Sequence, residues 1–284
     1  MDFRWVTDLA RVLGRVESKS PIGAMVLLRV RVPGWDQARP GQFAMLQAEG
    51  SDCFLGRALS VCEQSEETVS FLIAPVGVGT RELCSLAVGE ALWVLGPLGN
   101  GFDLKCLTEG SGRAVLVGGG AGIAPFPLAV SELGRLASTG GLKVGPPGEL
   151  AVLVLAGFKD SHQSLACELL TDSVARVVED GLACSYEEAL ENHPGRTSEL
   201  VTELLARHLR SGDRVAVCGP EAMARAVWDI CRAVPDVKAW FSLEANMACG
   251  VGSCHGCVVP LADGSYARVC REGPVFPGEE VFGD

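Results

Sequence analysis

Four cysteines near the carboxyl end of the sequence have the spacing of a metal or cluster site. They are separated by four, two and twelve residues, and they are Cys249, Cys254, Cys257 and Cys270. The first two intervals are those of plant-type [2Fe–2S] ligation, in which four thiolates hold two irons. The intervening loop 250–253 reads Gly-Val-Gly-Ser, so its backbone can adopt unusual φ values and approach sulfur closely. The spacing therefore predicts a [2Fe–2S] site.

A structural zinc site with four thiolates is the alternative. Zinc sites more often pair their cysteines in two separate knuckles than place three on one loop, so the cluster is favoured. His255 lies between two of the ligands, and we expect it to face solvent because four cysteines complete the set. The other eight of the twelve cysteines are scattered, mostly among apolar neighbours, where a free cysteine acts as a small hydrophobic residue.

A second candidate site is a glycine loop between an apparent strand and a helix. The segment 115–125 reads VLVGGGAGIAP, and bare N–H groups at a helix start attract phosphate while glycine permits close approach. A further strand ends in Cys218-Gly219-Pro220, and parallel sheets bind ligands at the carboxyl ends of their strands. The residues expected to bind a nucleotide are Gly118, Gly119, Gly120, Ala121, Gly122, Cys218, Gly219 and Pro220.

Two loops in the first third of the chain could also bind an anion. The guanidinium of Arg57, followed by Ala58, Leu59 and Ser60, could pair with phosphate in a bidentate way. The amides of Gly77, Val78, Gly79 and Thr80 could cradle an anion. Each loop taken alone is also compatible with an ordinary turn.

The elements that must position these residues fall into three parts. Residues 1–107 contain short runs rich in β-formers, at 24–32, 42–47, 68–73 and 91–95, which predict an antiparallel barrel or sandwich. After a polar linker at 108–112, residues 112–236 alternate strands (114–117, 150–157, 214–218) with helices (127–137, 164–170, 197–209, 222–233), which predicts a parallel sheet. A glycine- and cysteine-rich module occupies 240–284.

Composition limits the class of protein. Hydrophobic residues make up 48% of the 284 and charged residues 21%, which excludes global disorder. The formal net charge of -11 argues against a nucleic-acid partner. The amino terminus has no uninterrupted apolar segment, and the uncharged run 114–131 is broken by glycines and prolines, so we expect no signal peptide, no membrane span and a cytoplasmic protein.

The combination of motifs resembles the ferredoxin–NAD(P) reductase superfamily, which joins a flavin barrel with an R-x-x-S/T motif to a nucleotide domain with G-G-G-x-G-x-x-P and C-G-P. The tail, SLEANMACGVGSCHGC closing with RVCREGPVF, is similar to the electron-transfer subunit family of the NAD-linked, two-subunit dihydroorotate dehydrogenases. The resemblance covers essentially the whole chain. It implies a multidomain fold: an antiparallel β-barrel FAD domain, an α/β parallel-sheet NAD(P) domain and a small [2Fe–2S] module.

Residue roles follow from the resemblance. Arg57–Ser60 would bind FAD, with Ser60 near the flavin N5, and Gly77–Thr80 would contact the FAD phosphates; Ala58 stands where the family has proline. The two glycine-containing nucleotide loops would bind the nicotinamide nucleotide. The acidic residue of a dinucleotide fingerprint is not identifiable, so the preference for NAD rests on the resemblance, and we expect Lys159 to face solvent. No role is predicted for the loop 138–149.

The resemblance also implies a function. Electrons from dihydroorotate would leave FMN on a partner catalytic subunit and pass through the cluster and FAD to NAD+, in a heterotetramer with two copies of each subunit. No residue of this chain would act as an acid or base in the orotate chemistry. Two alternatives remain: a reductase-like subunit of a bifurcating, sulfide-linked or hydrogenase complex, and a zinc-stabilised regulatory module that binds nucleotide.

Overall fold

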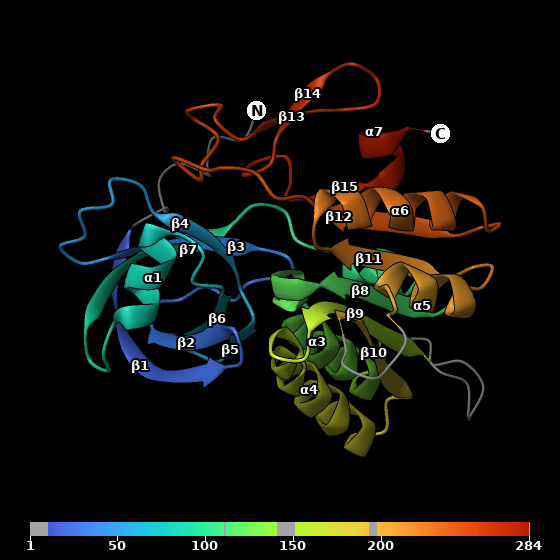
Figure 1. Ribbon diagram of the computed structural model, residues 1–284, viewed down its shortest axis with the longest axis horizontal. Helices are drawn as coiled ribbons and strands as arrows, with labels where there is room; N and C mark the ends of the chain where they lie inside the picture. The colour runs from blue at the N-terminus through green and yellow to red at the C-terminus, as the bar shows by residue number, and fades with distance from the viewer. Residues whose placement is uncertain (1–10, 111, 141–150, 193–197, 284) are drawn as a thin grey trace.

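The computed structural model describes residues 11–110, 112–140, 151–192 and 198–283. Figure 1 shows an antiparallel sheet at the left, a second sheet flanked by helices at the right, and a carboxyl-terminal segment that runs across the top of both. The multidomain architecture predicted from the sequence is confirmed. Within the described residues, no helix is long and apolar enough to cross a membrane.

The first sheet has the strand order β4-β3-β7-β1-β2-β6-β5 and is antiparallel throughout. The chain between β4 and β5 closes it: the Val61 amide donates to the Gln42 carbonyl (3.0 Å), and the next amide, that of Cys62, donates to Ser70 in β6 (2.9 Å). Its elements are β1 (Val12–Ile22), β2 (Met25–Arg31), β3 (Phe43–Ala48), β4 (Arg57–Ser60), β5 (Glu63–Gln64), β6 (Thr68–Ile73), α1 (Val78–Ser85) and β7 (Ala91–Leu98).

The strands expected from β-forming runs are present in this sheet. β6 occupies the predicted 68–73, and β2, β3 and β7 lie within three residues of their predicted ends. The long β1 was not predicted, because most of its side chains are polar or exposed and it lacks a clear apolar alternation. Its pairing with both β2 and β7 forms it nonetheless.

The second sheet has the order β10-β9-β8-β11-β12-β15, and its first five strands are parallel. The order reverses direction along the chain at β8, so the crevice between the ends of β8 and β11 is a topological switch point. The elements are α2 (Leu104–Leu107), β8 (Ala114–Gly119), η2 (Gly120–Ile123), α3 (Phe126–Ser138), β9 (Val152–Asp160), η3 (Gln163–Cys167), α4 (Glu168–Glu179), β10 (Cys184–Asn192), α5 (Val201–His208), β11 (Arg214–Cys218), α6 (Glu221–Arg232) and β12 (Lys238–Ser242).

Helices cover both faces of this sheet, which explains its continuous apolar strands. In β8, Leu116 packs in one core with α3 and α4, whereas Val115 and Val117 pack in another with α5 and α6. A buried ion pair fixes the start of the sheet, since the Arg113 guanidinium donates to Asp213 (Nη2 to Oδ2, 2.7 Å).

Several predicted boundaries in this part were wrong. The helix expected at 164–170 is a short 3₁₀ turn followed by α4, which extends to Glu179. The edge strand β10 was not predicted, because its sequence CSYEEALEN carries the charges that protect an exposed edge. The helix expected from 197 begins only at Val201; Thr197, Leu150 and the loop residues 141–149 lie outside the described residues.

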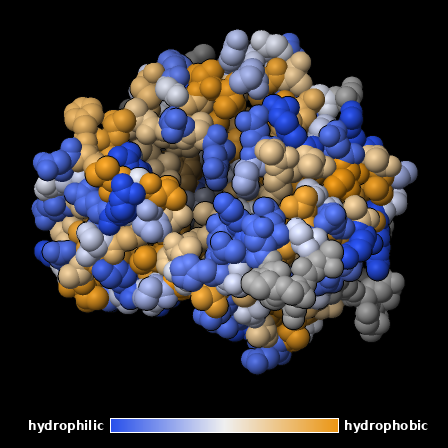
Figure 2. All heavy atoms as spheres, viewed as in Figure 1, coloured by the Kyte–Doolittle hydropathy of each residue, from blue (hydrophilic) through white to orange (hydrophobic). Residues whose placement is uncertain are grey.

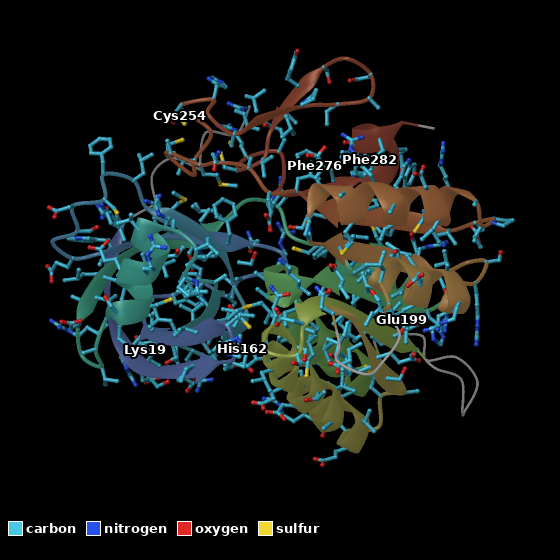
Figure 3. All side chains as sticks on the ribbon, viewed as in Figure 1. Lys19, His162, Glu199, Cys254, Phe276 and Phe282 are labelled. Carbon is cyan, nitrogen blue, oxygen red and sulfur yellow. The ribbon has the colours of Figure 1, made fainter. Side chains whose placement is uncertain are left out.

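The carboxyl-terminal segment contributes to the nucleotide sheet as well as forming its own hairpin. The hairpin pairs β13 (Val258–Pro260) with β14 (Tyr266–Arg268), and β15 (Val275–Pro277) then joins β12 in antiparallel fashion, with Phe276 opposite Phe241. The last helix, α7 (Gly278–Phe282), packs Phe282 edge-on against Phe241 at 4.9 Å between ring centroids. Figure 3 places Phe276 and Phe282 at this junction.

The barrel and the nucleotide sheet also touch directly. Glu63 in β5 pairs with Arg29 of the barrel (3.2 Å) and with Arg176 of α4 (3.4 Å). The turn between β1 and β2 lies against η3, because a Cβ built on Gly23 would fall 2.0 Å from the His162 carbonyl oxygen. Figure 2 shows hydrophilic and hydrophobic residues interspersed on this face, which is hollowed between the two parts.

Candidate functional site

The structure places the four cysteines of the tail in two neighbouring pairs. Cys249 and Cys254 are close enough for a hydrogen bond between their side chains, Cys257 and Cys270 likewise, and Cys249 acts electrostatically on Cys270. Cys257 and Cys270 are buried, whereas Cys254 is exposed at the upper edge of the molecule (Figure 3). The set therefore has an inner pair facing the protein and an outer part facing solvent.

Backbone amides point at these sulfur atoms. Gly252 N donates to Cys270 Sγ (3.1 Å), Gly256 N to Cys254 Sγ (3.4 Å), and Cys270 N to Cys257 Sγ (3.5 Å). Such hydrogen bonds stabilise thiolate charge and tune the potential of a cluster held by the thiolates. Thiols that accept hydrogen bonds from backbone amides suit a [2Fe–2S] cluster chemically, and the assignment of these four cysteines as its ligands stays a prediction.

The loop between Cys249 and Cys254 needs its glycines to direct backbone amides at the sulfur atoms. Gly250 and Gly252 have φ values of +72° and +81°, a region that other residues rarely adopt. His255 also has a positive φ, of +54°, and its side chain is exposed. The exposed position of His255 agrees with the expectation that it faces solvent.

The environment of the thiols is asymmetric. Burial opposes ionisation of Cys249, but backbone hydrogen bonds from Val251, Cys254 and Ser253 outweigh it and lower the pKa of this thiol to about 6. Burial and the neighbouring thiol of Cys257 raise the pKa of Cys270 to about 12. A bound metal cation would favour the thiolate form of both cysteines despite the raised pKa of Cys270, because metal binding requires thiolates and releases their protons.

The cluster loop rests directly on the barrel. A Cβ built on Gly250 would lie 2.6 Å from Met45 Cγ and 3.1 Å from Leu98 Cδ1. Met45 in β3 is also the pairing partner of Ala58 in β4, within the predicted flavin motif. A single strand therefore separates the cysteine loop from the motif 57–60.

Asn100 locks the second cysteine segment to the same part of the barrel. Its Nδ2 donates to the carbonyls of Arg271 (2.9 Å) and Glu272 (3.0 Å), and its backbone N donates to Gly273 (2.6 Å). The sequence predicts no role for Asn100. The partners lie more than 170 residues away in the chain, so no local signal could have found this role.

The two predicted anion loops of the barrel also meet. A Cβ built on Gly79 would lie 2.3 Å from Arg57 Nε, so only glycine lets the guanidinium cross the first turn of α1. Thr80 caps that turn, since its Oγ1 accepts from Gly77 N (2.9 Å). Arg57 bonds only the Gly56 carbonyl (3.3 Å) among the described residues. The cation and the helix start together fit a diphosphate.

The two nucleotide loops face each other across the switch point. Gly118 at the end of β8 pairs in register with Cys218 at the end of β11. A Cβ on Gly122 would fall 2.3 Å from the Cys218 carbonyl oxygen, and one on Gly119 would fall 3.1 Å from Pro220 Cδ. Glycine is therefore required here by close packing of the two loops, and the crevice has the place and composition of a dinucleotide site.

Two polar residues at the end of β12 and just after it, Ser242 and Glu244, lie near Cys218 beside this crevice. Burial, then the charge of Glu244, raises the pKa of Cys218 to about 12, while the Ser242 hydroxyl opposes the rise. Burial likewise raises the pKa of the Glu244 carboxyl. Cys218 was predicted to line the nucleotide site, whereas Glu244 and Ser242 were not. Their approach depends on the parallel pairing of β11 with β12, which a local pattern does not reveal.

The barrel, the parallel nucleotide sheet and the cysteine tail define a flavin-type reductase fold with an added cluster module. Solved structures share this fold: an NADH-dependent reduced ferredoxin–NADP oxidoreductase has a TM-score of 0.73 at 24% identity, covering 96% of this chain and 90% of the other. A ferredoxin NADP+ reductase from Neisseria gonorrhoeae, with bound FAD and NADP, has a TM-score of 0.63 at 14% identity, covering 82% of this chain and 99% of the other.

Sequence relatives are more specific. Residues 244–282 match the iron-sulfur cluster binding domain of dihydroorotate dehydrogenase B. The dihydroorotate dehydrogenase B (NAD(+)) electron transfer subunit of Clostridium perfringens is 36% identical over 85% of this chain and 86% of its own length. The corresponding subunit of Listeria monocytogenes is 31% identical over 95% and 97%. The chain belongs to the family of dihydroorotate dehydrogenase B electron transfer subunits, as the resemblance indicated.

We predict that Asn100→Ala loosens the segment that carries Cys270. The variant loses two side-chain hydrogen bonds and leaves two carbonyls without that donor, which costs about 1–2 kcal/mol of local stability. Hydrogen exchange of the amides of residues 270–273 and 275 should therefore accelerate roughly five- to thirtyfold. Asn192→Ala, at an exposed strand end, is the control, and equal exchange in the two variants would contradict the assigned role.

Proposed function

We propose that this chain is the electron-transfer subunit of an NAD-linked dihydroorotate dehydrogenase, delivering to NAD+ the electrons that a partner subunit removes from dihydroorotate. The observation that carries the proposal is the contact of the cysteine loop with Met45, one strand from the flavin motif. The similarity of the relatives over 85% and 95% of the chain supports the same reading for all three parts together.

The cofactors of this function are FAD, a [2Fe–2S] cluster and NAD. When bound, FAD connects two-electron exchange with a nicotinamide to one-electron exchange with an iron–sulfur centre. The chain's own task is to hold these groups in place. We assign Cys249, Cys254, Cys257 and Cys270 to the cluster, the loops 57–60 and 77–80 to FAD, and the loops 118–122 and 218–220 to NAD.

Each set of residues has a defined physical action. Arg57 and the amides of the first turn of α1 neutralise and orient the FAD diphosphate. The crevice between β8 and β11 directs the nicotinamide nucleotide toward the barrel, because both loops lie at the carboxyl ends of their strands. The amides of the cysteine loop favour thiolate over thiol. None of these residues needs to act on orotate itself.

The partner in this proposal is an FMN-containing catalytic subunit, in an assembly with two copies of each subunit. It docks where the cysteine loop meets the surface, because Cys254 is exposed there and electron transfer needs a short path. The choice of NAD over NADP follows the family, and Lys159 is exposed, as a solvated side chain would be. The cytoplasmic location stays a prediction.

We predict that Gly79→Ala weakens FAD binding. The new Cβ would lie 2.3 Å from Arg57 Nε, so the guanidinium must leave the helix start and lose a charge-assisted contact. The dissociation constant for FAD, measured by fluorescence titration of flavin-free protein, should rise roughly ten- to a hundredfold. Ser85→Ala, at the last turn of the same helix, should leave it unchanged. An unaltered affinity in Gly79→Ala would remove Arg57 and α1 from the FAD site.

We predict that Cys254→Ser abolishes cluster absorption and orotate-linked NAD reduction together. Serine replaces a thiolate ligand, so the cluster is lost or labile. The measurement is made on the variant co-expressed with its catalytic partner, with iron and sulfide assayed on the same sample. Cys106→Ser, which changes a half-buried cysteine outside the set, is the control. Full coupled activity without the cluster would exclude these cysteines from the electron route.

A further inference from the structure

Arg268 joins the two halves of the cysteine site. Its Nη1 donates to the Gly252 carbonyl (2.9 Å), on the loop that carries Cys249 and Cys254. Its own backbone lies in β14, opposite Val258, two residues before Cys270. One side chain thus spans from the strand leading to the fourth cysteine across to the loop that holds the first two.

Glu272 fixes this guanidinium in place. Its Oε2 accepts from both Nε (3.1 Å) and the backbone N (2.8 Å) of Arg268, while its Oε1 accepts from Nη2 (2.5 Å). The Arg268 carbonyl in turn accepts from the amides of Arg271 and Glu272, both at 3.0 Å. Arg268 therefore bonds to the turn that carries Cys270 through both its side chain and its backbone, and these bonds restrain the Arg268 guanidinium.

The guanidinium of Arg268 lies beside the cysteine loop. Besides its bond to Gly252, its Nη1 lies 3.3 Å from Nε2 of His255, the residue that follows Cys254, and an arginine stays cationic at every relevant pH. The second cation nearby, Arg271, differs. Its aliphatic carbons lie over Gly252, where a Cβ would be 2.6 Å from Arg271 Cδ, and its guanidinium makes no hydrogen bond or ion pair with the described residues.

We propose that Arg268 is a positioning residue that holds the cluster loop through Gly252 and raises the reduction potential of the cluster. A cluster held by four thiolates becomes more negative on reduction, and a fixed cation beside it stabilises the reduced form more than the oxidised form. Glu272 has the opposite electrostatic effect while keeping Arg268 in place. The inference rests on the proposed function only in taking the four cysteines as ligands of a [2Fe–2S] cluster.

The test is a redox titration of the isolated chain, without its partner, followed by electron paramagnetic resonance of the reduced cluster. Arg268→Gln should lower the ratio of reduced to oxidised cluster at a fixed potential by roughly tenfold, which is about 59 mV for a one-electron couple. Glu272→Gln, which keeps an acceptor for the guanidinium, should shift the ratio the other way. Arg268→Lys should give a smaller decrease, because lysine keeps the charge without the planar fork.

Arg271→Gln is the matched control, since it removes the same charge three residues away, and its shift should be smaller than that of Arg268→Gln. Shifts of Arg268→Gln and Glu272→Gln in the same direction, or equal shifts at Arg268 and Arg271, would overturn the proposal. If Arg268→Gln fails to retain iron, a rise in the reduction potential of the cluster in Glu272→Gln supports the proposal, and the absence of a rise refutes the proposal. A wild-type chain without a cluster signal would refute the proposed function as well.

Discussion

The contact of the cysteine loop with β3 is the constraint on which the rest of the structure depends. Met45 touches Gly250 on one side and pairs with Ala58 of the flavin motif on the other. The separation between the two candidate redox sites is therefore set by one strand of a closed sheet, which is among the least deformable elements a protein offers. Positive φ at Gly250 and Gly252 lets the loop lie this close, and Asn100 holds the segment after Cys270 against the same edge of the barrel.

The cluster module is built into both neighbouring parts because it is too small to stand alone. A segment of about 40 residues seldom buries enough apolar surface to fold by itself. Here its core takes residues from the barrel, and the buried side chains of that shared core are Phe43, Met45, Leu98, Cys257, Ala267, Val269, Cys270 and Phe276. β15 and α7 attach the other end of the module to β12 and α6. The arrangement fixes the cysteine loop relative to the flavin motif and the nucleotide crevice simultaneously, which is what short-range electron transfer requires.

Local signals in the sequence predicted the chemistry of the site better than its support. The spacing of the four cysteines, the glycine run after β8 and the short apolar runs of the central strands are all encoded within a few residues, and the structure brings the predicted residues of the two loop pairs together. Asn100 acts through partners more than 170 residues away, and β15 and Glu244 act through strand pairing with or beside β12, so none could be inferred from local patterns. The edge strand β10 was missed because its glutamates, which suit an exposed sheet edge, interrupt the apolar pattern expected of a strand. The cofactor roles of the individual residues stay predictions.

The most direct test of the account is anaerobic addition of NADH to the purified chain, with visible absorption recorded and iron, sulfide, zinc and flavin assayed. The account predicts iron, sulfide and FAD in a two-to-two-to-one ratio, and bleaching of both the flavin and the cluster bands by NADH, because the two sites are held one strand apart. A colourless protein with stoichiometric zinc, or a cluster that stays oxidised while the flavin is reduced, would contradict it.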